Sequence, residues 1–221
     1  MADGPRQPSR RILIVDDHPV VRQGFAQAIG CHPDLEVCGE AANVAEALRQ
    51  VDERHPDVVI IDISLDGEDG IELIDYIQSR RPSAKILVCS ARDEQTFAGR
   101  VLRAGARGYV SKREALPKIV EAIRQVLRGE IYLSPSMATS LLQSAAAGQP
   151  PEHDPVETLS NRELQIFQMI GEGLNMTQIA NRLSVSPKTI ESHRKLIKAK
   201  LKLPTGVELS RQAFLWVQKH S

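Results

Sequence analysis

The sequence is short of cysteine. It has three in 221 residues, Cys31, Cys38 and Cys89, and they form no CxxC pair. An odd number of cysteines in apolar surroundings indicates small buried hydrophobic residues in a reducing compartment rather than a disulfide framework.

Long apolar runs are also absent. No stretch approaches the roughly 18 to 20 apolar residues that span a bilayer, and the first residues, MADGPRQPSRR, lack the apolar core of a signal peptide. With 42% hydrophobic residues, no internal repeat and no extended low-complexity tract, the chain suits one large or two small soluble domains. We therefore expect a cytoplasmic protein with no membrane partner.

Net charge is zero, because 28 Lys and Arg residues match 28 Asp and Glu residues. The balance hides an asymmetry: residues 158–221 hold ten basic and four acidic side chains, a net charge of +6, which leaves −6 for the rest. This indicates two modules with different partners, and the basic one is the candidate for binding nucleic acid.

Prolines mark the boundary between the two modules. The segment GQPPEHDP cannot continue a helix because Pro150, Pro151 and Pro155 interrupt it, whereas SPSMATSLLQSAAA just before it could form a short one. We expect a tail, a first domain, a linker and a second domain at residues 1–10, 11–128, 129–156 and 157–221.

Strand and helix patterns alternate along the first domain. Short β-rich runs occupy residues 11–15, 35–41, 58–62, 85–89 and 108–111, and helical patterns occupy residues 20–29, 44–54, 71–80, 94–104 and 116–128. Five such units predict an α/β fold, a doubly wound parallel sheet with helices on both faces. Both common strand orders of this architecture bind ligands beyond the carboxyl ends of the strands.

Polar residues end four of these strands: Asp16 with Asp17, Asp62, Ser90 and Lys112. In the flavodoxin-like order the first and third strands flank the ligand crevice, so the three aspartates would converge. Three carboxylates in one crevice need raised pKa values or a cation, and an oxygen-only set with room for water favours Mg²⁺.

The chemistry that these residues suit is phosphoryl transfer to a carboxylate. Lys112 and the Ser90 hydroxyl can contact phosphoryl oxygens, while a metal ion and the lysine neutralise their charge. Taken singly, Asp-Asp at a strand end can be only a turn or a helix cap, and Lys112 only a solvated surface lysine. Their joint occurrence at the correct strand ends favours the phosphoryl site.

Four segments of the first domain read LIVDDHPVVRQGF, VVIIDISLDGEDGIEL, ILVCSA and GARGYVSK. Through them, residues 11 to about 128 resemble the receiver domain of bacterial two-component response regulators. The resemblance implies a flavodoxin-like fold with five parallel strands, phosphorylated on Asp62. It further implies that Mg²⁺ is bound by Asp16, Asp17, Asp62 and the Ser64 carbonyl. Lys112 matches the invariant lysine of that family. Ser90 and Tyr109 match the pair of residues that reorients on activation.

The loop after the third strand departs from that family. Leu65-Asp66 stands where Met-Pro is usual, and Glu68 and Asp69 follow. We expect this extra negative charge near Asp62 to weaken phosphorylation or to speed phosphate loss.

The second domain reads as a helix-turn-helix. Ser160 followed three residues later by Glu163 is a capping box that begins the first helix. A second helix, MTQIANRL, and a turn, SVS, lead to a third helix that Ser186 caps and Pro187 opens.

The third helix, PKTIESHRKLIKAKL, has two distinct faces. At about 100° per residue, Ile190, Ile197 and Leu201 share one face, which we expect to be buried. Small, polar and basic side chains form the opposite stripe: Lys188, Ser192, Lys195, Ala199 and Lys202. Such a stripe can be simply a solvated face, but only Glu191 opposes six Lys and Arg residues between 188 and 202, which favours insertion into the major groove of DNA.

The run LSNRELQIFQMIGEGLNMTQIANRLSVSPKTIESHRKLIKAKL resembles the LuxR/NarL-type helix-turn-helix, over residues 157 to 203. By this resemblance Glu191, Ser192 and Lys195 contact bases, and the residues that contact the DNA backbone are Lys188, Thr189, His193, Arg194 and Lys198. His193 could instead be a packed helix residue, and Leu196 replaces an asparagine that is usual in the family.

The two resemblances together imply a transcription factor, a response regulator of the NarL/FixJ type, and no enzyme. A histidine kinase would phosphorylate Asp62 with Mg²⁺, and phosphorylation would control homodimerisation and binding to an inverted repeat in double-stranded DNA. One alternative keeps DNA binding but makes the receiver a phosphorylation-independent dimerisation or protein-binding module. The enzyme alternative is an aspartyl-phosphate phosphohydrolase of the haloacid-dehalogenase type, which needs an aspartate two residues after the nucleophile, where this chain has Ser64.

Overall fold

A computed structural model describes residues 9–65, 70–146 and 155–219 of the chain. The chain divides into two compact units, Met1–Ala138 and Thr139–Ser221. Each unit has its own core.

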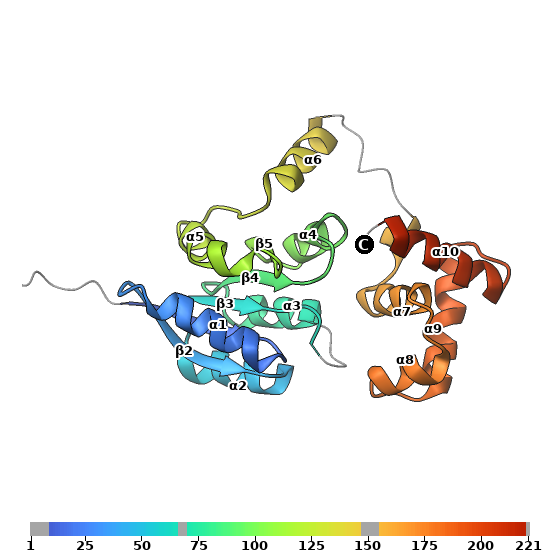
Figure 1. Ribbon diagram of the computed structural model, residues 1–221, viewed down its shortest axis with the longest axis horizontal. Helices are drawn as coiled ribbons and strands as arrows, with labels where there is room; N and C mark the ends of the chain where they lie inside the picture. The colour runs from blue at the N-terminus through green and yellow to red at the C-terminus, as the bar shows by residue number, and fades with distance from the viewer. Residues whose placement is uncertain (1–8, 66–69, 147–154, 220–221) are drawn as a thin grey trace, which may run out of the picture. The chain divides into compact units, whose positions relative to one another are not determined.

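The first unit is a parallel sheet, and its described part has five strands in the order β2-β1-β3-β4-β5 (Figure 1). The strands are β1 (Arg10–Val15), β2 (Leu35–Ala41), β3 (Val58–Ile61), β4 (Lys85–Ser90) and β5 (Gly108–Ser111). All four residues of β3 are buried, as a strand covered on both faces requires. The predicted doubly wound, flavodoxin-like order is therefore confirmed.

Helices cover both faces of this sheet. They are α1 (Pro19–Gly30), α2 (Val44–Arg54), α3 (Gly70–Arg80), α4 (Glu94–Arg103) and α5 (Ala115–Leu127). Helices α1 and α5 pack against each other over one face, where Phe25, Ile119 and Ile123 meet Ile14 and Ile60 of the sheet. On the other face, α3 contacts both α2 and α4 (Figure 1). Because all strand pairs are parallel, the carboxyl ends of the strands lie at the same end of the sheet.

The residues after α5 return to the sheet. Tyr132 pairs with Gly108, its N–H donates to the Arg107 carbonyl at 2.9 Å, and its carbonyl accepts from the Tyr109 N–H at 2.9 Å. A Cβ on Gly108 would lie 2.8 Å from the Tyr132 carbonyl oxygen, so only glycine permits this approach. The first linker residues are thus hydrogen-bonded into the first unit.

Helix α6 (Pro135–Ala146) follows directly. The Ser134 hydroxyl accepts from the Met137 N–H at 3.2 Å, while the Ser134 N–H donates to the Glu94 carboxylate on α4 at 2.9 Å. The start of α6 is therefore tied to the beginning of α4.

The second unit is helical. It includes the part of α6 after Ala138. The elements that follow are a 3-10 turn (Pro155–Thr158), α7 (Asn161–Gly171), α8 (Met176–Arg182), α9 (Pro187–Lys200) and α10 (Gly206–Lys219). The predicted capping box is confirmed, because the Ser160 hydroxyl accepts from the Glu163 N–H and the Glu163 carboxylate accepts from the Ser160 N–H. Phe167 of α7 and Trp216 of α10 meet edge to face, 5.9 Å between ring centroids.

The cysteine prediction is right for one residue only. Cys89 on β4 is buried, but Cys38 is half-buried and Cys31 is exposed. Cys38 lies on β2, the outermost strand on its side, and Cys31 lies just past the last residue of α1. An apolar neighbourhood in sequence does not specify burial at such positions.

Among the described helices, none has both the length and the apolar character to cross a membrane.

Candidate functional site

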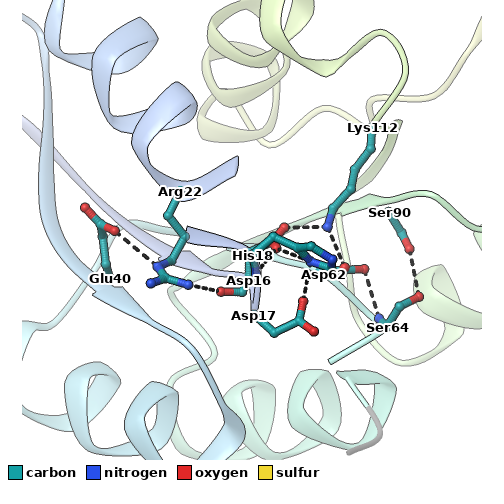
Figure 2. A network of polar contacts seen from close by, with 9 residues as sticks. All are labelled: Asp16, Asp17, His18, Arg22, Glu40, Asp62, Ser64, Ser90 and Lys112. Carbon is teal, nitrogen blue, oxygen red and sulfur yellow. Dashed lines mark hydrogen bonds and ion pairs between the residues drawn. The ribbon is translucent and has the colours of Figure 1, made fainter. Parts of the chain in front are cut away.

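Three carboxylates meet beyond the carboxyl ends of β1 and β3, and we call Asp16, Asp17 and Asp62 the acidic pocket (Figure 2). Val15 and Ile61 are register partners, so the residues that follow them leave the sheet side by side. Asp16 and Asp62 are each only 2% exposed. The ligand atoms of the pocket and of His18 all lie within 4.8 Å of one another.

Lys112 bridges two of these carboxylates. Its Nζ lies 2.6 Å from Asp16 Oδ2 and 2.6 Å from Asp62 Oδ2. Its backbone N–H donates to the Ser90 carbonyl at 2.9 Å, which fixes the chain just beyond β5. Burial alone would lower the pKa of Lys112, but the charges and hydrogen bonds of Asp62 and Asp16 outweigh it and raise that pKa. The ammonium is therefore charged at neutral pH.

The acidic pocket fits a hard divalent cation. Lys112 contacts two of the three carboxylates, so the cluster holds more acidic groups than this lysine can pair. Carboxylate oxygens are the ligands that Mg²⁺ prefers. The Ser64 N–H donates to Asp62 Oδ1 at 2.9 Å, which holds the third carboxylate and places Ser64 beside it.

His18, which was not among the predicted site residues, adjoins the pocket. Its Nδ1 lies 2.6 Å from Asp17 Oδ1 and 3.3 Å from Asp16 Oδ1, and its backbone N–H donates to Asp16 Oδ1 at 2.9 Å. The signal was available, since His18 directly follows the two aspartates.

Ser90 and Tyr109 are linked through a further residue, Arg92. Ser90 is fully buried, its hydroxyl lies 3.4 Å from the Ser64 hydroxyl, and it accepts from the Arg92 N–H at 3.3 Å. The Tyr109 hydroxyl donates to the Arg92 carbonyl at 2.7 Å. Burial raises the pKa of the Tyr109 phenol, so this hydroxyl keeps its proton and remains a donor. The Arg92 Nε also donates to the Ser64 hydroxyl at 3.0 Å.

Gly70, the first residue of α3, packs on the backbone beside Asp62. A Cβ there would lie 2.5 Å from Ile63 Cα and 2.7 Å from the Asp62 carbonyl oxygen. A glycine following a loop gave no sequence signal for this contact, which the tertiary fold creates.

The acidic side chains expected to disturb Asp62, namely Asp66, Glu68 and Asp69, lie outside the described residues.

The two faces of α9 are oriented as predicted. Ile190 and Ile197 are fully buried and Leu201 is 7% exposed. The residues expected to contact DNA fall into two groups. The exposed ones are Lys188, Thr189, Glu191, Ser192 and Lys195. The half-buried ones are His193, Arg194 and Lys198. His193 Nδ1 is buried without a hydrogen-bond partner in the described part of the chain.

A hollow of about 260 Å³ adjoins this outward face. It is lined by Met176 of α8, Gly206 of α10 and four residues of α9, Glu191, Arg194, Lys195 and Lys198. Three cations against one carboxylate suit an anionic ligand such as a phosphate of nucleic acid. Met176 and Gly206 were not predicted, because they join the face only through tertiary packing.

Glu163 connects the first and last helices of the helix-turn-helix. Its buried carboxylate accepts from Lys200 Nζ at 2.6 Å as well as from the Ser160 N–H. Burial would raise the pKa of Glu163, but these two donors outweigh it and lower that pKa. The ion pair fixes the carboxyl end of α9 against the start of α7.

Two known families match this chain. The response regulator receiver domain matches residues 12–124, and the family described as bacterial regulatory proteins, luxR family, matches residues 157–213. The first match spans the acidic pocket and the second spans α9.

Relatives match along nearly the whole chain. The oxygen regulatory protein NreC of Staphylococcus carnosus is 38% identical over 208 residues, which are 92% of this chain and 96% of NreC. The response regulator GacA of Pseudomonas aeruginosa is 36% identical over 201 residues, 90% of this chain and 93% of GacA. A solved structure of RcsB from Salmonella enterica serovar Typhimurium, bound to promoter rprA in the presence of the phosphomimetic BeF3−, has a TM-score of 0.60 and 27% identity and covers 92% of this chain and 98% of that one.

Proposed function

Because the chain belongs to the response regulators that join a receiver domain to a LuxR-type DNA-binding domain, we propose that phosphorylation of Asp62 controls its binding to promoter DNA. The single observation that carries the proposal is the position of Lys112 Nζ, 2.6 Å from both Asp16 and Asp62. A lysine held there faces the oxygens of a phosphoryl group that joins Asp62.

The proposed reaction is transfer of a phosphoryl group from a phosphohistidine of a sensor histidine kinase. An Asp62 carboxylate oxygen attacks phosphorus, the phosphorus–nitrogen bond breaks, and an acyl phosphate forms on Asp62. Bound Mg²⁺, held by the acidic pocket and the Ser64 carbonyl, would supply charge neutralisation. Lys112 contributes the positive charge that this chain itself provides.

The proposed switch consists of Ser90 and Tyr109. The Ser90 hydroxyl, 3.4 Å from Ser64, is close enough to Asp62's loop to donate to a new phosphoryl oxygen. Such a movement would disturb the Arg92 N–H that now donates to Ser90, and hence the Arg92 carbonyl that accepts from Tyr109. Phosphorylation would thereby reach the start of α4.

The proposed DNA interface is the exposed face of α9. Glu191, Ser192 and Lys195 contact bases in the major groove, and the backbone contacts come from Lys188, Thr189, His193, Arg194 and Lys198. Structures of RcsB bound to promoter DNA support a DNA partner for this chain. The protein acts as a homodimer on an inverted repeat, in the cytoplasm, without a membrane partner and as a regulator rather than an enzyme.

We also propose that the chain consists of four regions. These are a tail, a receiver domain, a linker and a DNA-binding domain at residues 1–10, 11–128, 129–156 and 157–221. The matched families, which span residues 12–124 and 157–213, support the two domains.

Incubation with acetyl phosphate and Mg²⁺ tests the proposal. The intact mass should rise by one phosphate, and Asp62→Asn should remove this gain, whereas Asp75→Asn, at an exposed aspartate of α3, should keep it. An unmodified wild-type mass would count against the receiver chemistry. If the wild type and Asp62→Asn then occupy the same genomic sites in footprinting, the phosphorylation-independent alternative holds.

A further inference from the structure

Arg22 lies beside the acidic pocket, between Asp16 and Glu40 (Figure 2). It stands in the first half of α1, and its side chain is only 16% exposed. The Nη1 donates to the backbone carbonyl of Asp16 at 2.6 Å, and the Nε donates to the Glu40 carboxylate on β2 at 3.2 Å. One guanidinium therefore joins the end of β2 to the peptide between Asp16 and Asp17.

That peptide is the point where β1 leaves the sheet. The Asp16 N–H still donates to the Ala41 carbonyl at 3.1 Å, as the last bond toward β2. The Asp16 carbonyl lies beyond the strand, and Arg22 is its donor. Because a peptide unit is planar, a fixed Asp16 carbonyl also fixes the direction in which the chain enters Asp17.

We propose that Arg22, oriented by Glu40, is a positioning residue that holds the Asp16–Asp17 peptide in the geometry that Mg²⁺ binding requires. This inference rests on the proposed function, since it concerns the metal site of the same pocket. Neighbouring carboxylates repel one another, and the hydrogen bond from Arg22 restrains the backbone that carries Asp16 and Asp17. Groups that hold metal ligands in this way typically change metal affinity by about 10–100-fold when they are removed.

A purely structural role for Arg22 makes a different prediction. Arg22 could serve only to fasten α1 to β2, and its removal would then lower the melting temperature without changing metal affinity. A positioning role lowers metal affinity in protein that is fully folded. The two roles are therefore separated by measuring both quantities on the same variants.

The experiment uses the full chain and Mn²⁺ as a spectroscopic probe of the hard-cation site. Mn²⁺ binding is titrated by electron paramagnetic resonance, and thermal unfolding is followed in EDTA and in excess Mg²⁺. The variants are Arg22→Met, Arg22→Lys and Glu40→Gln. Arg124→Met is the matched control, because Arg124 makes an ion pair with Asp34 in the same unit, at 2.8 Å, away from the pocket.

Arg22→Met should weaken Mn²⁺ binding about tenfold, and the extra stabilisation by Mg²⁺ should shrink accordingly. Glu40→Gln, which leaves the guanidinium in place but loosens it, should weaken binding less. Arg22→Lys keeps one donor and should recover part of the affinity, and Arg124→Met should bind as the wild type does.

Wild-type affinity in both Arg22→Met and Glu40→Gln would overturn the proposal, including when their melting temperatures fall. Should Arg22→Met fail to fold, Glu40→Gln and Arg22→Lys still decide, since an unchanged affinity in both would also overturn it. Failure of the proposed function looks different, because wild-type protein would then neither bind Mn²⁺ at this pocket nor gain phosphate.

Discussion

Each buried carboxylate in the described part of the chain contacts a lysine. Asp16 and Asp62 share Lys112, and Glu163 accepts from Lys200. An unpaired buried charge costs several kcal/mol, so each lysine stabilises the buried carboxylates that it contacts. For Glu163, whose folded-state pKa is lowered, the ion pair also links stability to pH.

Glu163 allows this link to be tested in the second unit. Its folded-state pKa lies below the ordinary 4.5, so the ion pair stabilises the fold above about pH 4.5 and the stabilisation is lost as pH falls through the lower folded-state value. Lys200→Met should cost about 1–2 kcal/mol at neutral pH, because the lysine is partly exposed and solvent screens its charge. The cost should shrink as pH falls below 4.5.

Urea unfolding followed by the fluorescence of Trp216, the single tryptophan, measures this cost at each pH. Lys202→Met, at an exposed lysine just past the same helix, is the control and should show no such trend. A cost for Lys200→Met that stays constant from pH 7 to pH 3 would contradict the ion-pair account.

Two lysines of α9 should contact different parts of the DNA, one the bases and the other the phosphates. Lys195 is exposed in the centre of the outward stripe, where it can reach a guanine edge, whereas half-buried Lys198 lies nearer the flank where phosphates pass. Lys195→Ala should therefore lose about 1–3 kcal/mol of discrimination for the operator over random DNA. Lys198→Ala should weaken both and reduce the salt slope by about one unit.

Binding isotherms at several salt concentrations, on operator and scrambled duplexes, make the comparison. Equal weakening of the two duplexes by Lys195→Ala would mean that its side chain contacts phosphate and that the helix is rotated in the groove.

At the scale of the helices, α7 and α10 pack closely against each other at Gly171. A Cβ on Gly171 would lie 2.4 Å from the backbone carbonyl oxygen of Ala213, an atom that cannot move without shifting α10. Gly171→Ala should therefore destabilise the second unit by about 1–3 kcal/mol, despite the better helix propensity of alanine.

The Trp216 fluorescence transition reports this change directly, since Trp216 on α10 packs on Phe167 of α7. Gly206→Ala is the matched control in the same unit. Its Cβ would meet only the end of the Arg194 side chain at 3.4 Å, an ordinary contact, so its stability should stay within about 0.5 kcal/mol of wild type. A Gly171→Ala variant as stable as this control would show that α10 can shift freely.

The elements themselves were predictable because their signals are local. The apolar run Val58–Ile61 and the capping box at Ser160 each specify an element within a few residues. Because Asp62 directly follows a predicted strand, its position near the other aspartates could also be predicted. Arg22 and Arg92 were not predicted as parts of the site, because their partners are a backbone carbonyl and a hydroxyl that only the folded chain brings near. A surface arginine and a site arginine look alike in sequence.

At the scale of the whole molecule, the prediction concerns assembly. A single recognition helix reads a short half-site, so affinity and spacing selectivity require two copies. Leu209 of α10 is buried and belongs to the core, whereas Phe214 is 52% exposed and remains available for contact with a second copy. We expect the phosphorylated protein to bind an inverted repeat as a dimer.

Light scattering of the complex on its best operator measures the stoichiometry. Asp62→Asn, treated in the same way, is the control and should bind more weakly. A complex of one protein chain per operator would contradict the prediction.

The pairing of Tyr132 with Gly108 has a consequence for solubility. Strand β5 is the last in the order of the sheet, and such an edge offers unpaired N–H and C=O groups to strands of other molecules. Tyr132 occupies part of that edge by bonding Arg107 and Tyr109. A fragment that stops at Arg128 would uncover these groups and aggregate through them, whereas one that extends to Ala138 would keep the edge covered.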